Sequence, residues 1–440
     1  MQPRCARAGT ALAALALLLA GCATHGERFA EIDHALGAHG PHTALERADS
    51  RFRGGDPVLD LLEEGMLLHL AGDPAQSNER LEEAARRMDE LDPFSFSEGV
   101  AAVTISEGLR GFVGEPYQRT AVHLVRAFNY IALDQWDEAR VEALRIDLRL
   151  QALAGSTRFY RDDGFARYVS GLIFEQLGEH DDARIAYRRA LDAYRDQEMI
   201  TGLAPPRALQ NALLRQTAHP DFAHEHERLR ADFGVAGEIP RAASGQGRVV
   251  LILGNGRAPR LHEAAVNAQN PHTGRLYRVA VPRHGRSRQP LNGAELHVGE
   301  RSAPVDVAHD IDALSRRSLE ERMPGIMARA AVRVAAKNEM VREAGDRDPF
   351  LGLFANIFTF ASERADDRTW ASLPGEYLVA DFAVPAGEHP VRVELRGRAG
   401  QRWQEELGTV TVEPGRIRVL FAHSISTSVP FHRVVAGEPS

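Results

Sequence analysis

Residues 27–230 carry apolar side chains at every third or fourth position, and this period constrains the fold more than any other feature. Side chains spaced in this way share one face of an α-helix. The same stretch has few runs of β-branched residues and is rich in Ala, Leu, Glu and Arg, which favour helices. The sequence therefore predicts that the first half of the chain is helical.

Within this helical half, small and aromatic residues recur in a pattern that resembles the tetratricopeptide repeat (TPR). That repeat is a pair of helices with small residues where the helices cross and aromatic residues in the space between them. In the clearest copy the small residues are Gly171, Ala183 and Ala190, and the aromatic residues are Phe174 and Tyr187. Gly178 is expected to end the first helix of this pair.

Two further copies of the pattern are less regular. The second fits Ala127, Tyr130 and Ala139, with Asp134 where the helix-ending glycine would stand, and the third begins at Gly65. Corresponding positions lie farther apart than the roughly 34 residues of a regular array, so we expect insertions between the copies. The pattern favours a TPR-like α-solenoid, and a plain helical bundle without a binding groove is the alternative.

The periodicity changes after residue 235, where small residues, glycine and proline indicate a linker over 236–247. We expect a signal peptide (1–21), a TPR-like domain (22–235), this linker, and a β-rich α+β domain (248–440). The strands expected in the last part are 249–253, 276–281, 295–298, 303–307, 377–384, 390–395, 409–412 and 417–422. The last four of these predict an antiparallel sheet that forms half of a small sandwich. A helix is expected over 311–342, with Pro324 as a kink or break.

The first 22 residues resemble a bacterial lipoprotein signal. Two arginines precede an apolar run, Ala11–Ala20, and the lipobox consists of Leu19, Ala20, Gly21 and Cys22. The run is shorter than the roughly 20 residues of a membrane-spanning helix, and an ordinary cleaved signal does not require this cysteine. The resemblance implies cleavage before Cys22, which then carries a diacylglycerol and an acyl chain such as palmitate. Because Ala23 follows Cys22, the resemblance also implies a location in the outer membrane, facing the periplasm.

The composition limits the chemistry of the mature chain. The two cysteines are Cys5, in the signal, and Cys22, so no thiol is left for a disulfide, a metal or a nucleophile. A formal net charge of −8 without a basic block argues against nucleic acid as a partner. The Gly-Asn-Gly turn at 254–256 lacks the third glycine of a dinucleotide fingerprint, and residues 219–226 lack the spacing of paired metal ligands. We therefore predict no catalytic, cofactor or metal site.

Several segments together are similar to an uncharacterised family of proteobacterial TPR outer-membrane lipoproteins. They are the lipobox, the repeat over 165–194, the strand and turn over 253–256, and the segments 365–374 and 385–389. The resemblance implies a role in the cell envelope. Arg368 and Trp370 are expected to enter the first strand of the terminal sheet, and Trp370 is either a packing residue or a binding residue.

These features predict a lipid-anchored periplasmic adaptor of the outer membrane. We expect its repeats to present a concave surface to another cell-envelope protein, whose identity the sequence does not indicate. Contact with the membrane is expected through the N-terminal lipid. We expect neither an enzyme nor a small-molecule cofactor. The alternative is a peptidoglycan- or glycan-binding factor, or a hydrolase, with its site in the β-rich domain.

Overall fold

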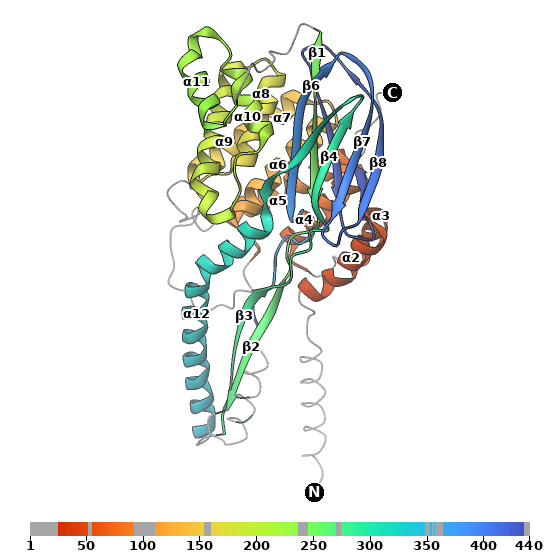
Figure 1. The fold of residues 1–440 in the computed structure, drawn as a ribbon. Coiled ribbons are helices and arrows are strands. Elements are labelled where there is room, and N and C mark those ends of the chain that lie inside the picture. The colour runs from red at the N-terminus through yellow and green to blue at the C-terminus, as the bar shows by residue number, and fades with distance from the viewer. Residues whose placement is uncertain are drawn as a thin grey trace.

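The computed structural model places helices first and a mixed eight-stranded sheet after them (Figure 1), which confirms the predicted helix-then-strand layout. It describes residues 25–51, 55–91, 111–153, 160–235, 245–269, 274–347, 353, 356 and 364–434. The predicted signal and lipobox, Leu19, Ala20, Gly21 and Cys22 included, lie outside these residues. Among the described helices, none combines the length and hydropathy that crossing a membrane requires.

Successive helices of the first half pack against each other as pairs. The pairs are α2 (His25–His39) with α3 (Pro41–Arg51), α4 (Pro57–Ala71) with α5 (Pro74–Glu90), α6 (Pro116–Ala132) with α7 (Trp136–Leu153), α8 (Gly164–Gln176) with α9 (His180–Thr201), and α10 (Arg207–Gln216) with α11 (Ala223–Asp232). Local sequence explains their starts. Asp56, for example, precedes the proline that opens α4, and its side chain accepts hydrogen bonds from the first turn.

The small residues predicted at helix crossings lie between paired helices. A Cβ atom on Gly171 of α8 would lie 2.5 Å from the ring of Tyr187 in α9, and one on Gly65 of α4 would lie 2.7 Å from Leu81 in α5. Because both distances are shorter than real Cβ contacts, each glycine allows a close approach of its two helices. The predicted alanines are fully buried: Ala127, Ala139, Ala183 and Ala190.

The predicted aromatic and helix-ending residues lie in the same helix pairs. Tyr187 and Phe174 are buried, and Tyr130 is partly buried. Gly178 follows α8 with a φ of +78°, and Asp134 occupies the turn between α6 and α7 with a φ of +57°. Each residue therefore adopts the left-handed conformation that ends a helix.

The main sheet is mixed rather than antiparallel, which corrects the prediction. Its strand order is β10-β9-β1-β6-β5-β4-β7-β8, and β1 pairs with β9 in parallel. The strands are β1 (Gln246–Asn255), β4 (Leu291–Val298), β5 (Arg301–Asp310), β6 (Glu376–Pro385), β7 (Gly387–Gly397), β8 (Arg402–Val412), β9 (Ile417–Ser424) and β10 (His432–Val434). The sheet curls far enough for β8 to contact β1 and β9, so one sheet encloses its own apolar core instead of forming half of a sandwich.

The remaining elements form a projection from one end of the body (Figure 1), which we call the arm. It consists of the hairpin β2 (Leu261–Gln269) and β3 (Leu276–His284), together with α12 (Ile311–Arg347). β3 continues through Pro282, where the sequence predicted its end, and α12 continues through Pro324 without a break. The sequence did not predict β2.

Two further predictions of element boundaries were wrong. Gln246 and Gly247, assigned to the linker, begin β1 and pair with Pro385 and Val384 of β6. Arg368 and Trp370 precede β6, which starts only at Glu376. In both places hydrogen bonds to distant residues determine where the strand begins, and a local pattern does not contain that information.

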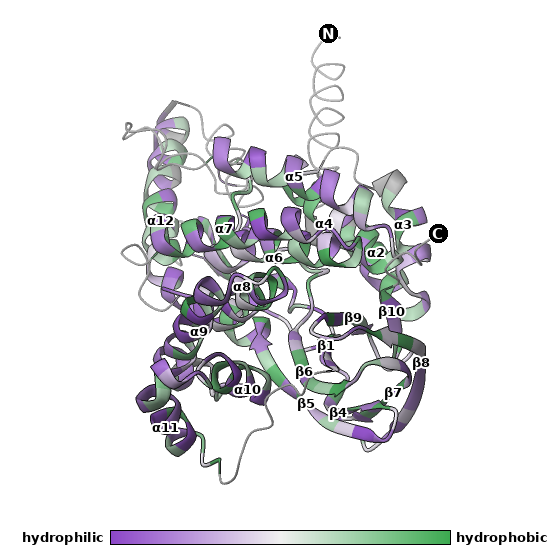
Figure 2. Ribbon diagram, turned by 90° about the horizontal axis from the view of Figure 1, so that it is seen from above, coloured by the Kyte–Doolittle hydropathy of each residue, from purple (hydrophilic) through white to green (hydrophobic). Residues whose placement is uncertain are grey.

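The sheet covers the face of the helix layer that was expected to form an open concave surface. Phe128 of α6 lies 5.2 Å from Phe421 of β9 and 5.6 Å from Tyr377 of β6, ring centre to ring centre. Phe165 of α8 lies 5.3 Å from Tyr377. One apolar core includes helix residues and one side of β1, β6 and β9, and Figure 2 shows the helices curving round that side of the sheet. This face of the helix layer is therefore covered by the chain itself.

Buried charges also join the helices to the sheet. Arg248 of β1 donates two hydrogen bonds to Asp381 of β6 (2.8 and 2.9 Å) and pairs with Glu175 of α8 (2.6 Å). Arg215 of α10 donates to Asp381 as well (3.1 Å), and the Tyr187 hydroxyl donates to Glu175 (2.7 Å). Burial opposes the charge of Glu175, but the two guanidinium groups lower its pKa to about 2. Two positive and two negative charges thus balance inside the interface.

The segment before β6 is held against the first helices. Glu63 of α4 accepts hydrogen bonds from the backbone N–H groups of Ala371 (2.7 Å) and Ser372 (3.0 Å). Arg368 donates to the carboxylate of Asp56 (2.7 Å). Trp370 between them is fully buried in the core shared by helices and sheet, which favours the packing interpretation of this residue.

Candidate binding groove at the base of the arm

A groove of about 780 Å³ lies between β3 and α12, where the arm joins the body. Its lining combines apolar side chains with a cationic edge. The residues that line it are Pro282, Arg283, His284, Arg316, Leu319, Glu320, Met323, Pro324 and Met327. We call this site the arm groove.

A small apolar core supports the arm groove from beneath. Leu261 of β2 packs with Leu319 and Ile326 of α12, and Val281 and Met323 pack against them. These contacts hold the hairpin to one face of the helix. The groove therefore lies on two regular elements, which position side chains more firmly than a loop does.

The arm groove is also fixed to the helical body. Ser318 of α12 donates a hydrogen bond to Glu115, the residue that precedes α6 (2.6 Å), and Arg322 pairs with the same carboxylate (2.6 Å). Pro324 follows two residues after Arg322, where it removes a backbone donor from the helix and favours a kink. Figure 1 shows α12 changing direction between the body and the hairpin.

The lining carries two arginines, Arg283 and Arg316, and one carboxylate, Glu320, which pairs with Arg317 outside the lining. Arg316 donates to Asp312 (2.5 Å) and to the carbonyl oxygen of Gly285 (3.0 Å), which holds its guanidinium at the groove. His284 donates to the carbonyl oxygen of Ser315 (3.0 Å), and burial lowers the pKa of its ring. Arg283 is exposed. The site can thus accept an apolar segment that carries acidic side chains.

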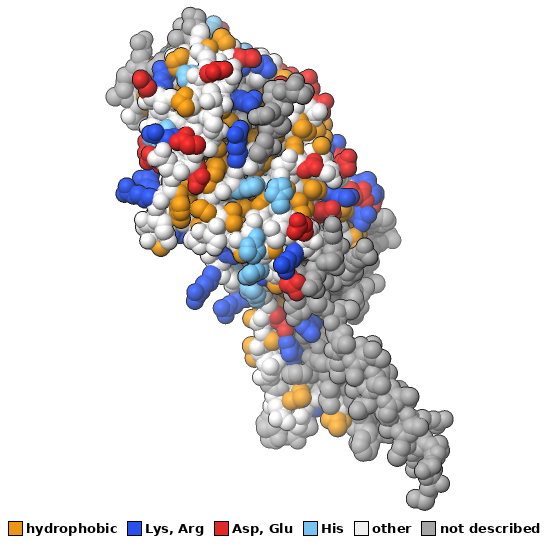
Figure 3. Space-filling model, turned by 90° about the vertical axis from the view of Figure 1, so that its right-hand side faces the viewer, with side chains coloured by type: hydrophobic (Ala, Val, Ile, Leu, Met, Phe, Trp, Pro, Cys, Tyr) orange, Lys and Arg blue, Asp and Glu red, His pale blue; other side chains and the backbone are white. Residues whose placement is uncertain are grey.

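Exposed apolar side chains continue along the arm beyond the groove. Met327 and Met340 of α12 are 48 % and 63 % exposed, and Val332 between them is 51 % exposed. Val266 of β2 is also exposed, and Figure 3 shows hydrophobic side chains on the surface of the narrow part below the body. Exposed apolar side chains beside a groove are a feature of many protein-binding sites. Methionine suits such a surface because its flexible side chain adapts to a partner.

The residues singled out in the sequence lie elsewhere. The predicted crossing residues of the helix pairs are inside the helical body and do not line the groove. Asn255 of the Gly-Asn-Gly turn is buried and donates to Leu291 and Glu376, which indicates a structural role. His219 and Asp221 are exposed at the start of α11. None of these segments contributes to the arm groove.

Sequence reasoning missed the groove because its two walls are distant in the chain. Met323 and Met327 keep the helical spacing of the helix expected over 311–342. The available signal was that this helix carries more apolar side chains than one face can bury, among them Val332 and Met340. Nothing in the sequence indicates that the strand over 276–281 lies beside this helix. No protein-family model matches the chain, and a search of curated proteins also finds no match.

Proposed function

We propose that the chain is a lipid-anchored adaptor of the outer membrane, facing the periplasm, that binds another cell-envelope protein through the arm groove. The arm groove carries the proposal, because it combines an apolar floor, a cationic edge and adjoining exposed methionines on a rigid support. An amphipathic segment with acidic side chains fits this chemistry, since helical partners commonly dock their apolar face into such grooves.

In this proposal the helix pairs are TPR-like repeats that act as a frame. The glycines and alanines at their crossings support that assignment, as does the resemblance to the TPR lipoprotein family. TPR-like repeats commonly bind partners on the concave side. Here Phe128 and Phe165 pack against the sheet on that side. We therefore assign partner binding to the arm and leave the repeats a structural role.

The lipid anchor predicts a large effect of one substitution outside the folded body. Cys22→Ala removes the residue proposed to carry the acyl chains, so the protein should no longer float with outer membranes in a density gradient. The circular dichroism spectrum and thermal unfolding of the body should not change, because the lipid acts on location alone. Continued flotation of the variant with outer membranes would contradict the lipoprotein assignment.

Two substitutions in the arm groove test the proposed binding site. Arg283→Glu reverses an exposed charge at its edge, and Met323→Asp places a charge on its apolar floor. Each should reduce the amount of partner captured from envelope extracts at least about tenfold, as the loss of a central contact does. Met199→Asp is the matched control, because Met199 of α9 is 96 % exposed and lies outside the groove.

Folding is checked in the same preparations. Arg283→Glu alters an exposed side chain, so its thermal unfolding should match that of the unmodified protein, which keeps the test valid even if Met323→Asp loosens the arm. Undiminished capture by a folded Arg283→Glu variant would exclude a cationic edge as part of the binding site. Equal losses in all three variants would show that capture does not depend on the groove.

A further inference from the structure

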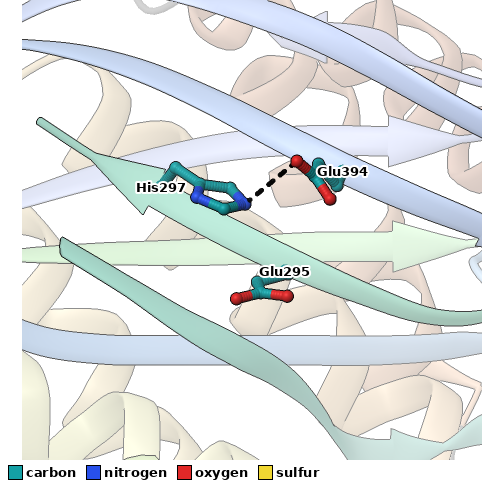
Figure 4. Close-up of side chains that lie close together, drawn as sticks. All are labelled: Glu295, His297 and Glu394. Carbon is teal, nitrogen blue, oxygen red and sulfur yellow. Dashed lines mark ion pairs between the residues drawn. The ribbon is translucent and has the colours of Figure 1, made fainter. Parts of the chain in front are cut away.

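Two strands of the main sheet bring three metal-binding side chains together on its outer face (Figure 4). Glu295 and His297 lie two positions apart on β4, and Glu394 lies on the neighbouring strand β7. Ala294, Leu296 and Val298 point into the core of the curled sheet, so the alternation of the strand directs Glu295 and His297 outward. One ligand atom from each of the three residues lies within 4.8 Å of the others.

The two carboxylates face each other directly across the strands. Glu295 is the register partner of Glu394 in the antiparallel pair of β4 and β7. Like charges at directly opposed positions destabilise a sheet, and a cation between them removes that repulsion. Arg392, the register partner of His297, makes no ion pair with either carboxylate in the described part of the chain. Among the described residues, the group recorded beside Glu394 is the ring of His297.

The position of the His297 ring supports a metal ion as that cation. Its Nε2 atom lies 3.4 Å from Glu394 Oε1, is buried, and makes no hydrogen bond among the described residues. Two ligand atoms about 2.0–2.1 Å from a tetrahedral zinc ion lie roughly 3.4 Å from each other. The imidazole and the carboxylate thus stand at the separation that one shared zinc ion requires.

A neighbouring hydroxyl orients one of the carboxylates. Ser302 of β5 donates a hydrogen bond to Glu295 Oε1 (2.8 Å), which leaves Oε2 of that side chain for a ligand. Outer partners of this kind fix the direction of metal-binding groups. The cluster therefore has three ligands from two paired strands and a support from a third strand.

We propose that Glu295, His297 and Glu394 bind one divalent transition-metal ion, with zinc as the best fit to one imidazole and two carboxylates. Three protein ligands leave a fourth tetrahedral position for water or for a group of a partner molecule. The sequence predicted no metal site, because Glu394 is about a hundred positions away from the other two and their spacing forms no known motif. This site is independent of the arm groove and goes beyond the proposed adaptor function.

Isothermal titration calorimetry tests the proposal. Zn²⁺ is titrated into the untagged full-length protein in detergent. We expect saturable binding of one ion per chain at micromolar zinc, and a rise in the unfolding temperature of the loaded protein. His297→Ala and Glu394→Gln should each weaken the affinity at least about tenfold, because each removes one of three ligands.

The matched control is His389→Ala on the same strand as Glu394. His389 donates to the carbonyl oxygen of Pro385 and does not belong to the cluster, so this variant should bind Zn²⁺ as the unmodified protein does. The side chains of Glu295, His297 and Glu394 face outward, and circular dichroism of the His297→Ala and Glu394→Gln variants should show an unchanged fold. Absence of saturable binding, or equal affinity in the folded His297→Ala variant, would overturn the proposal.

Discussion

Asp381→Ala is expected to lower the free energy of unfolding by about 3–5 kcal/mol, the range for removing one partner of a buried ion pair. Asp381 is fully buried and accepts hydrogen bonds from Arg248 and Arg215. The substitution leaves these two guanidinium groups with Glu175 as their shared counter-charge, in a place that water does not reach. Urea unfolding at pH 7, followed by circular dichroism, measures the change.

Asp306→Ala is the matched control for this prediction. Asp306 of β5 also pairs with an arginine of α10, Arg207, but that pair lies at the rim, where Arg207 is exposed. An exposed pair contributes about 0–1 kcal/mol, so the control should unfold near the unmodified protein. If both variants lost similar amounts of unfolding free energy, the buried charges would contribute no more to stability than the exposed pair.

Trp370→Ala is expected to lower the free energy of unfolding by about 3–5 kcal/mol, as removal of a large buried ring does. Trp370 is fully buried, and its indole N–H donates to Ser372 (3.1 Å). Trp403→Ala, the same substitution at a partly buried position of β8, should cause a smaller loss. Fluorescence and circular dichroism should report one shared transition, because helices and sheet contribute to one core.

One outcome would contradict the prediction for Trp370→Ala. If the helices kept their stability in Trp370→Ala while the sheet alone unfolded earlier, the two parts would be independent units. Residue-resolved hydrogen exchange distinguishes the cases, because protection in α4 and in β6 should fall together. A loss of protection in β6 without a loss in α4 would contradict the shared core.

Features with a local physical cause could be predicted from the sequence. The helices follow from the apolar period over 27–230, and the turn after α8 follows from Gly178, which adopts a positive φ. The strands expected over 295–298 and 303–307 lie within β4 and β5, which are neighbours in the chain and pair antiparallel. Each of these features depends on residues that are close together in the chain.

Features that depend on distant residues could not be predicted. The parallel pairing of β1 with β9 joins segments that begin at Gln246 and Ile417, and nothing in either segment specifies the other. Arg248 stands at the start of a strand that reads as apolar, and its role is visible only once Asp381 and Glu175 are beside it. The sequence showed a helical layer but not that a sheet from the same chain covers it.

The two candidate sites were hidden for related reasons. β2 is poor in large apolar residues and its middle is exposed, so it lacked the alternation of a strand with one buried face. The walls of the arm groove, β3 and α12, were both expected, but no pattern in the sequence places them side by side. The cluster of Glu295, His297 and Glu394 requires the register of β4 against β7. In both cases the chemistry is created by tertiary contacts and not by a motif.

Photo-cross-linking in living cells tests most directly the claim that this protein binds an envelope partner through the arm groove. A photoreactive phenylalanine derivative replaces Met327, which lines the groove and is 48 % exposed, in one strain, and Met199 on the outer surface of α9 in another. The proposal predicts a specific adduct with one cell-envelope protein from position 327 and none from position 199. The absence of an adduct from position 327, or the same adduct from position 199, would contradict it.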